Sequence, residues 1–88
     1  MAEREIFCER LRRRRMALGY NQRTLARLLD WKPSTISHYE RGRYKQSMSF
    51  ARLRQVARAL ATSTDYLLGL SSDPGPIPEE HAFAEDVP

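Results

Sequence analysis

The amino-acid sequence predicts an all-α fold: a compact five-helix domain over residues 1–70, followed by an irregular acidic tail over residues 71–88. Two observations support this prediction. Apolar residues recur every three or four positions through most of the chain before Ser71, which is the spacing of one face of an α-helix. No segment alternates apolar and polar residues in the manner of a half-buried strand, so no β-sheet is expected.

The first predicted helix covers residues 4–18. It contains no glycine or proline, and Gly19 supplies a stop at its end. Its apolar residues recur at helical spacing and define the side that packs into the core: Phe7, Leu11 and Leu18. Cys8 is expected to be a small, partly buried apolar residue, with redox sensing as the less favoured interpretation.

The second predicted helix covers residues 22–29. Asn21 precedes it and is a good cap, because its side-chain oxygen can accept a hydrogen bond from the first turn. The apolar stripe of this helix consists of Leu25, Leu28 and Leu29.

The third predicted helix begins at Pro33 and ends near Arg41, before Gly42. Proline is favourable at the first helical position, because its missing N–H would be unpaired there anyway. A short turn joins this helix to the second one, and its inward residues are Ile36 and Tyr39.

Two more helices are predicted after a polar, basic loop over residues 42–48. Ser49 caps the first of them, residues 50–60, and Ser63 caps the second, residues 64–68. The apolar face of the longer helix consists of Phe50, Leu53, Val56, Ala57 and Leu60.

Charge is distributed unevenly along the chain. All 15 lysines and arginines but only six acidic residues precede Ser71, so the segment 1–70 carries a net charge of +9. The segment 71–88 carries a net charge of −5 and four of the five prolines, a composition that predicts no regular structure. The basic part suits a polyanion, because each phosphate that it neutralises releases condensed counterions.

Several classes of protein are disfavoured by the composition. The single cysteine excludes an intramolecular disulfide, and no Cys or His residues have the spacing of zinc ligands. No apolar run approaches the roughly 18 residues of a membrane span, and the charged start of the chain is unlike a secretory signal. No paired carboxylates, nucleophile–base set or phosphate-binding glycine loop is present. We therefore expect an intracellular protein that is not an enzyme and has no metal or cofactor.

Residues 22–41, QRTLARLLDWKPSTISHYER, carry the most specific pattern in the chain. Two short helices joined by a three-residue turn, with a small residue inside the first, describe a helix-turn-helix. Ala26 is the small residue, since a larger side chain would push the crossing helices apart. The inward positions that fix the crossing are Leu25, Leu29, Trp31, Ile36 and Tyr39. Trp31 is therefore expected in the core rather than as a stacking platform.

The pattern resembles the XRE family, the Cro and phage-repressor type of helix-turn-helix domain. Four segments agree with the family in order and spacing: RLRRRRMALGYNQ, TLARLLDW, STISHYERGR and SFARLRQVARALATSTDYLLG. They extend from about Arg10 to Gly69, roughly two-thirds of the chain. The resemblance implies a lambda-repressor-like fold whose second and third helices read DNA. It also implies a bacterial or phage protein that acts in the cytoplasm.

In the resembled family, the start and outer face of the third helix contact base edges in the major groove. The matching residues here are Pro33, Ser34, Thr35, Ser37 and His38. Backbone phosphates are contacted from the start of the second helix and from both flanks of the third, here by Asn21, Gln22, Lys32, Arg41, Arg43 and Lys45. For Arg41, Arg43 and Lys45 the resemblance also allows contact with the minor groove. Simple capping is the favoured interpretation for Asn21, and an ordinary solvated surface is the alternative for the others.

The run from Arg12 to Arg15 does not form one surface. At about 100° per residue, four consecutive side chains spread around most of a helix. Arg15 lies beside the buried stripe, and the resemblance implies that it pairs with Glu40 and braces the first helix against the third. The other arginines of the run are expected to be solvated.

The chain departs from the family pattern at three positions. Asp30 occupies a turn position where glycine is usual, and Ala61 replaces the usual glycine after the fourth helix. Lys32 stands where a capping serine or threonine is common, so the third helix is expected to start without a side-chain acceptor. Asp30 and Lys32 are expected to tilt the start of that helix.

The leading functional hypothesis is a sequence-specific transcriptional repressor that binds a palindromic operator in double-stranded DNA as a homodimer. Tyr66, Leu67 and Leu70 form an apolar end that is the candidate dimer contact, with a core position as the alternative for Leu67. The alternative function is an antitoxin or protein-interaction module whose DNA binding is autoregulatory. In that case the acidic tail over residues 71–88 engages a protein partner or competes with DNA for the basic face.

Overall fold

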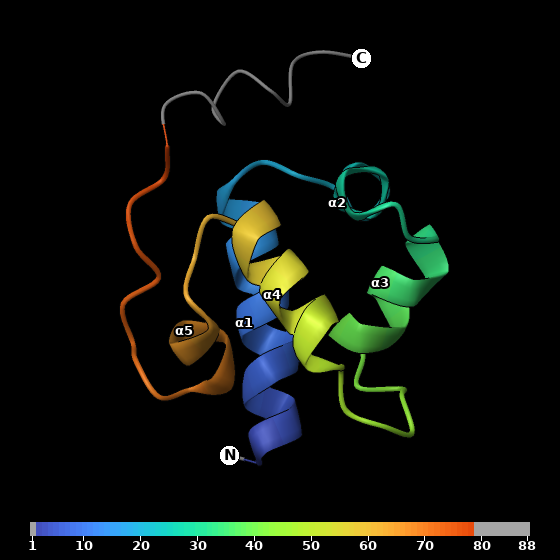
Figure 1. Ribbon diagram of the computed structural model, residues 1–88, viewed down its shortest axis with the longest axis horizontal. Coiled ribbons are helices and arrows are strands. Elements are labelled where there is room, and N and C mark those ends of the chain that lie inside the picture. The colour runs from blue at the N-terminus through green and yellow to red at the C-terminus, as the bar shows by residue number, and fades with distance from the viewer. Residues whose placement is uncertain (1, 79–88) are drawn as a thin grey trace.

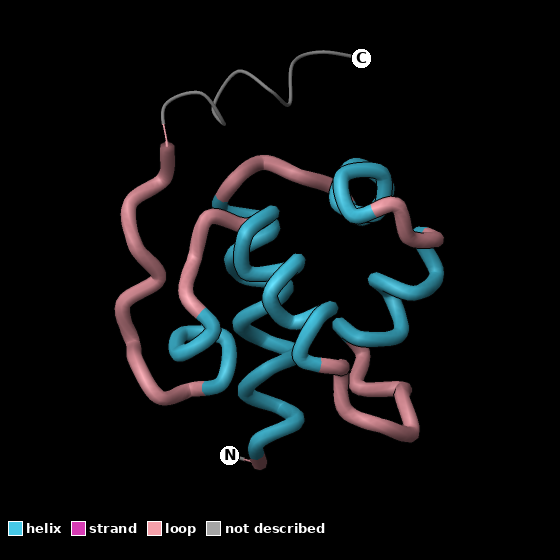
Figure 2. Tube along the Cα trace, viewed as in Figure 1, coloured by secondary structure: helices cyan, strands magenta, loops and turns pink. Residues whose placement is uncertain are grey.

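The computed structural model describes residues 2–78 of the 88-residue chain. This range contains five helices and no strand (Figures 1 and 2). The helices are α1 (Glu3–Ala17), α2 (Gln22–Leu29), α3 (Pro33–Glu40), α4 (Phe50–Ala59) and α5 (Thr64–Leu68). The predicted all-α class and the five helices are confirmed, and each observed boundary lies within one residue of the predicted one.

Helices α1 and α4 lie at the centre of the molecule (Figure 1). In Figure 1, α4 crosses in front of α1, the α2–α3 pair lies on one side of them, and α5 lies on the other. Helix α1 packs against α3 and α5, and α4 packs against α2 and α5. The core lies between these helices, and its most deeply buried residues, each 1% exposed or less, include Leu11, Leu25, Ile36, Val56, Leu60 and Leu67.

Three predicted capping residues hold the starts of helices. The side chains of Asn21, Ser49 and Ser63 accept hydrogen bonds of 2.7, 3.1 and 3.0 Å from the backbone N–H three residues later. Each cap contributes about 1 kcal/mol, because it satisfies an N–H that has no partner inside the helix. Helix α3 has no side-chain cap at Lys32 and opens with Pro33 instead.

Asp30 and Ala61 both adopt the left-handed backbone conformation, with φ of 59° and 51°. These are the two positions at which the resembled family usually has glycine. Aspartate tolerates this region because its short polar side chain can hydrogen-bond locally, whereas alanine has no such compensation. The turn at Asp30 lets the backbone N–H of Trp31 donate to the carbonyl of Ala26 at 2.8 Å, which closes the end of α2.

Two residues predicted on the apolar helix faces lie outside the core. Phe50 is 88% exposed and Leu28 is 56% exposed. Six residues of α-helix turn through about 600°, which leaves Phe50 about 120° from the buried Val56. Leu28 lies to one side of Leu25 and lines an open groove between α2 and α4. The buried face of each of these two helices therefore contains fewer residues than the apolar face predicted from the sequence.

The predicted apolar end at α5 also requires correction. Tyr66 is 3% exposed and Leu67 is 0% exposed, because both pack into the core, so neither is available to a partner. The exposed apolar residues at this end are Leu70 (76%) and Leu68 (45%).

Arg14 is buried, contrary to the prediction that it is solvated. The residue is only 2% exposed. Its guanidinium donates four hydrogen bonds of 2.9–3.1 Å to the backbone carbonyls of Leu60, Ala61, Gly75 and Pro76. A cation suits this place, because the carbonyls at the end of α4 have no partners within the helix and carry its partial negative charge.

The described part of the tail, residues 71–78, is irregular but packs on the domain. Besides the bonds from Arg14, the hydroxyl of Thr62 donates to the carbonyl of Pro74 at 2.7 Å, and Arg10 donates to the carbonyl of Ser71 at 2.5 Å. Figure 1 shows this segment running along the edge of the molecule beside α5. Residues 79–88, which contain most of the tail's acidic side chains, lie outside the described residues, and the partner role predicted for them stays a prediction.

Candidate nucleic-acid interface

Helices α2 and α3 form a helix-turn-helix whose inner side is fixed to the core. Ala26 is 1% exposed and lies where the two helices pack together. Ile36 (0% exposed) and Tyr39 (9%) anchor α3 from behind. Trp31 in the turn packs against the core, with its ring centroid 6.2 Å from that of Tyr39. Contacts with the core therefore fix the position of the helix-turn-helix and leave the outer side of α3 exposed.

The five residues predicted to contact base edges all lie on α3 but differ in their exposure. Pro33, Ser34 and His38 are exposed, whereas Thr35 and Ser37 are half-buried. Ser34 and His38 are four residues apart, so they lie on the same side of the helix, one turn apart. Within residues 2–78, no hydrogen bond or ion pair occupies either of these two side chains, so both present their polar atoms to solvent.

The carboxylate of Glu40, at the end of α3, joins three helices. Arg15 from α1 donates to it through Nε and Nη2 at 2.5 and 2.9 Å, and Gln22 from α2 donates through Nε2 at 3.1 Å. The side chains of Arg15 and Glu40 are only 10% and 4% exposed. Removing one partner of such a buried pair leaves an uncompensated charge, at a cost of about 3–5 kcal/mol. This network sets how α3 is held relative to α1 and α2.

Asn21 and Gln22, at the start of α2, differ in what they leave for a phosphate. The side-chain oxygen of Asn21 accepts the capping hydrogen bond from the backbone N–H of Thr24 at 2.7 Å, which leaves its Nδ2 amide group with two N–H donors. The Gln22 amide uses one N–H for Glu40 and has a second N–H. Both amide groups therefore keep N–H donors that no hydrogen bond among residues 2–78 uses.

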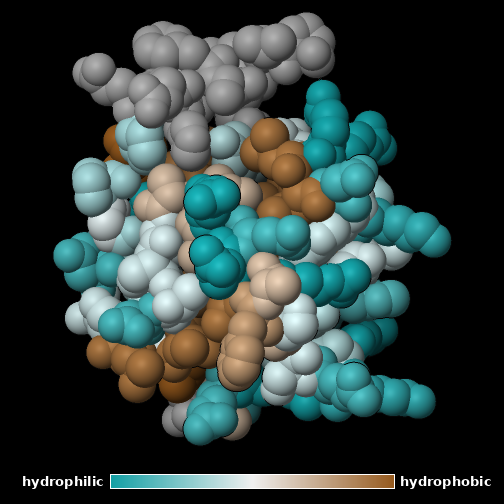
Figure 3. Space-filling model, in the orientation of Figure 1, coloured by the Kyte–Doolittle hydropathy of each residue, from teal (hydrophilic) through white to brown (hydrophobic). Residues whose placement is uncertain are grey.

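Exposed basic side chains flank α3 at both ends. Lys32 precedes the helix, and Arg41, Arg43 and Lys45 follow it. A helix in the major groove lies between two phosphate backbones, so positive charge at both of its ends matches that surface. Figure 3 shows hydrophilic side chains projecting from the side of the molecule on which α2 and α3 lie.

The loop over residues 42–48 is anchored by Tyr44, a role that the sequence patterns did not reveal. The Tyr44 ring centroid lies 5.0 Å from that of Tyr39. The guanidinium of Arg4 lies 4.5 Å over the Tyr44 ring and also donates to the carbonyl of Gly42 at 3.3 Å. A tyrosine in a basic loop carries no local signal of this role, because its partners are distant in sequence.

Burial raises the pKa of the Tyr44 hydroxyl above its ordinary value of 10.0, and the neighbouring Cys8 adds to this effect. The nearby Arg4 guanidinium opposes the shift without reversing it. The raised pKa indicates that the Tyr44 hydroxyl is partly shielded from water. Arg43 and Lys45, on either side of it in sequence, are exposed and point their charges to solvent.

Arg52, on the first turn of α4, is a second residue whose place in this surface was missed. Its guanidinium lies 4.8 Å over the Trp31 ring and donates to the Tyr39 hydroxyl at 3.3 Å. It therefore adds positive charge beside the turn between α2 and α3. The sequence alone does not distinguish Arg52 from the exposed Arg54 and Arg58 of the same helix.

Other kinds of site are not apparent in the described part of the chain. Residues 2–78 contain no group of three or more His, Cys, Asp or Glu side chains that could hold a metal ion. No helix in that range is long and apolar enough to span a bilayer. Cys8 is a buried free thiol at 8% exposure.

Comparison with known proteins agrees with this geometry. The model of a helix-turn-helix family matches residues 11–67, more than half of the chain. The chain belongs to this helix-turn-helix family. The XRE resemblance drawn from the sequence is thereby confirmed.

Two relatives of this helix-turn-helix protein carry names that refer to transcription. It is 47% identical over 58 residues to an "uncharacterized transcriptional regulator in ATPase CF(0) region" from Rhodospirillum rubrum. The match covers 66% of this chain and 52% of that protein, so the chain spans about half of the relative's length. A solved structure, the hypothetical transcription factor NHTF from Neisseria, superposes with a TM-score of 0.70 at 25% identity, over 76% of this chain and 75% of that one.

Proposed function

We propose that this helix-turn-helix protein binds double-stranded DNA sequence-specifically, with α3 in the major groove, and thereby regulates transcription. The observation that carries the proposal is the pair of exposed side chains Ser34 and His38, on the outer face of a helix held from behind by Ile36 and Tyr39. The names of the two relatives support the same function.

The chemistry of the α3 surface suits base edges. A serine hydroxyl both donates and accepts hydrogen bonds, and a histidine N–H donates to an acceptor such as guanine N7. Pro33, Thr35 and Ser37 complete the proposed reading surface, with the apolar atoms of Pro33 and Thr35 suited to a thymine methyl group.

Phosphate contacts position the helix without reading sequence. We assign them to Gln22 together with the start of α2 next to Asn21, and to the exposed basic residues Lys32, Arg41, Arg43, Lys45 and Arg52. Each phosphate neutralised lowers the slope of log K against log salt by about 0.9, so binding should weaken steeply as salt is raised.

The proposed DNA-bound form is a homodimer on a palindromic operator. The described domain measures 35 × 27 × 21 Å. The longest of these dimensions is comparable with the roughly 34 Å between half-sites one helical turn apart, so each copy of a two-fold pair fits one half-site. Repression requires only that this dimer occupies the operator, and we place this bacterial or phage protein in the cytoplasm.

Selection of bound sequences from random duplex DNA tests this function. The expected result is enrichment of a two-fold symmetric sequence, with half-sites about 10–10.5 base pairs apart or a multiple of that spacing. Recovery of unenriched sequences, bound equally at low salt, would contradict sequence-specific recognition.

A second candidate is a protein-interaction role for the acidic tail, residues 71–88, in an antitoxin-like module whose DNA binding is autoregulatory. The opposite charges of the tail (−5) and of the segment 1–70 (+9) favour some interaction between them or with a basic partner. Removing only residues 79–88 tests competition with DNA, because the contacts of residues 71–78 are kept. Tighter DNA binding would support competition, and unchanged binding would exclude it.

A further inference from the structure

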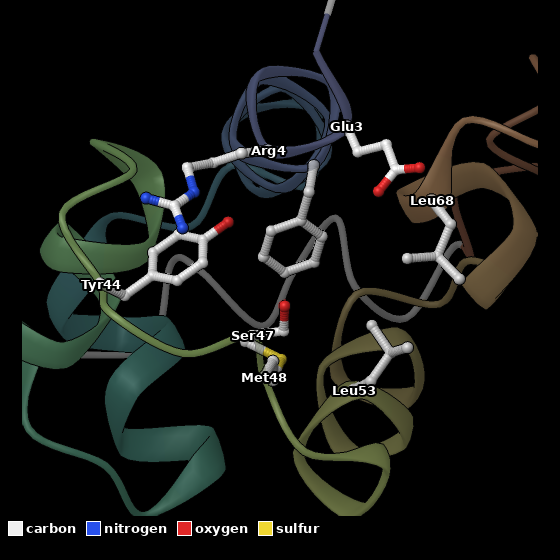
Figure 4. Close-up of a pocket in the computed structure, with 8 residues that line it drawn as sticks. Glu3, Arg4, Tyr44, Ser47, Met48, Leu53 and Leu68 are labelled. Carbon is white, nitrogen blue, oxygen red and sulfur yellow. The ribbon is translucent and has the colours of Figure 1, made fainter.

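The end of the molecule formed by α1, α4, α5 and the 42–48 loop contains a groove that no proposed DNA contact uses. It has a volume of about 260 Å³. Its apolar lining comes from α1, the loop, α4 and α5, one residue from each: Phe7, Met48, Leu53 and Leu68. Figure 4 shows Arg4 and Tyr44 on one side of this groove and Glu3 and Leu68 on the other, with Met48 and Leu53 between them.

Phe50 is the most exposed large apolar residue among those described, at 88%. It is the first residue of α4 and lies two residues after Met48 and three before Leu53, both of which line the groove. Positions three apart on a helix are neighbours on its surface, so Phe50 stands at the rim of the groove. One face of the molecule therefore bears both a projecting ring and an apolar hollow.

A surface that carries both a projection and its complement can pair with itself through a two-fold axis. Exposed apolar area extends along the same end of the molecule through Leu68 (45% exposed) and Leu70 (76%). An aromatic anchor inserted into a pocket is the usual energetic centre of such an interface.

The charges at the edges of the groove also favour a second copy. Glu3, in the first turn of α1, lies on one edge. The opposite edge carries the exposed Arg4, whose guanidinium lies 4.5 Å over the ring of the groove-lining Tyr44. A two-fold rotation brings the acidic edge of one copy toward the basic edge of the other.

We propose that Phe50 of one copy inserts into this groove of a second copy, and that the groove of the first copy receives Phe50 of the second. This inference rests on the proposed binding of DNA by a two-fold homodimer, and it identifies the surface through which the two copies contact each other. Because the 42–48 loop supplies both a wall of the groove and the basic residues next to α3, dimerisation and DNA contact share one segment.

Sedimentation equilibrium of the purified chain and of Phe50→Ala tests the proposal. We expect a concentration-dependent dimer whose association constant falls about 30-fold or more in Phe50→Ala, because each dimer loses two anchoring rings. Leu28→Ala is the matched control: it also truncates an exposed apolar residue (56%), but at the separate groove between α2 and α4, and it should leave association unchanged. Both positions are exposed, and far-UV circular dichroism checks that both variants are folded.

A mixing experiment distinguishes insertion into the groove from stacking of one Phe50 on the other. Ser47→Trp, at an exposed position that lines the groove, blocks the hollow and leaves the ring intact. Each variant alone should be monomeric where the parent chain is dimeric. A mixture of the two should form a mixed dimer, because the ring of one variant still finds the open groove of the other.

Unchanged association of Phe50→Ala, or no mixed dimer, would overturn the inference. Binding of Phe50→Ala to a duplex with a single half-site separates this failure from failure of the proposed function. Retained half-site binding together with unchanged association would overturn only the dimer surface.

Discussion

Arg14 and Gly75 lie 61 positions apart in the sequence and are joined by a hydrogen bond of 3.1 Å from guanidinium to carbonyl oxygen. The same guanidinium holds the carbonyls of Leu60 and Ala61 at the end of α4. Within residues 2–78, no carboxylate forms an ion pair with Arg14, so carbonyl dipoles compensate this buried charge. The start of the tail is therefore part of the folded domain.

Ending the chain after Asp73 should destabilise it by about 1–3 kcal/mol relative to a chain ended after Pro78. The shorter chain removes two carbonyl partners of a buried cation and the bond from Thr62 to Pro74, and such losses carry a desolvation penalty. Urea unfolding followed by circular dichroism measures the difference.

The chain ended after Pro78 is the control, and its stability should match the full chain within about 0.5 kcal/mol. Equal stability of the two truncated chains would show that the Arg14 contacts to the tail contribute nothing. Deleting all of residues 71–88 would mix a loss of stability with any release of competition for DNA, so the shorter deletion is the one to use in binding assays.

Glu40→Gln should lower the free energy of unfolding by about 3–5 kcal/mol, because it leaves Arg15 buried without a counter-charge. Glu9→Gln is the matched control. Glu9 also pairs with an arginine, Arg13, but the two side chains are 41% and 63% exposed, and a surface pair contributes at most about 1 kcal/mol. Similar losses in both variants would contradict the bracing role of the network around Glu40.

The helices could be predicted from the sequence because their signals are local. The caps at Asn21, Ser49 and Ser63 each act within a single turn, and the proline at the start of α3 restricts its own φ. Arg14 carried a usable signal too, since it lies three residues after Leu11 and four before Leu18, within the buried stripe. Because arginine is charged, it was expected to be exposed to solvent. The four carbonyls that accept its hydrogen bonds belong to residues about 46–62 positions later in the sequence, so no local pattern reveals them.

The candidate interface could be predicted only in part. The spacing of the inward residues of α3 placed Ser34 and His38 on the outside. Tyr44 and Arg52 were missed, because their roles depend on Arg4 over the Tyr44 ring and on Arg52 over the Trp31 ring. Contacts of this kind join elements that meet only after folding, so no local spacing reveals them.

Ala61→Gly should stabilise the protein by up to about 1 kcal/mol, because it removes the strain of an alanine at φ 51°. The greater freedom of glycine in the unfolded chain offsets part of this gain. Ala57→Gly, inside α4, is the control and should destabilise by at least about 0.5–1 kcal/mol. Urea unfolding distinguishes the two, and destabilisation by both would show that Ala61 is not strained.

Tyr44 should titrate above the ordinary tyrosine value of 10.0, because burial disfavours its phenolate. A raised pKa in the folded state means that the contribution of Tyr44 to stability is complete below pH 10 and is lost as pH rises through the folded pKa. Absorbance at the phenolate band, compared between the parent chain and Tyr44→Phe, isolates this step. A pKa at or below 10.0 in the difference curve would contradict the shielding of the Tyr44 hydroxyl from water.

The most direct test of the account is the affinity of Ser34→Ala and His38→Ala for a selected duplex and for a scrambled one, at one fixed salt concentration. Each substitution should weaken binding to the selected duplex by about 1–3 kcal/mol and leave binding to the scrambled duplex unchanged, because base contacts specify and phosphate contacts position. Ser72→Ala, at an exposed serine of the tail, should change neither affinity. Unchanged affinity for the selected duplex, or equal losses on both duplexes, would contradict the claim that α3 reads DNA sequence.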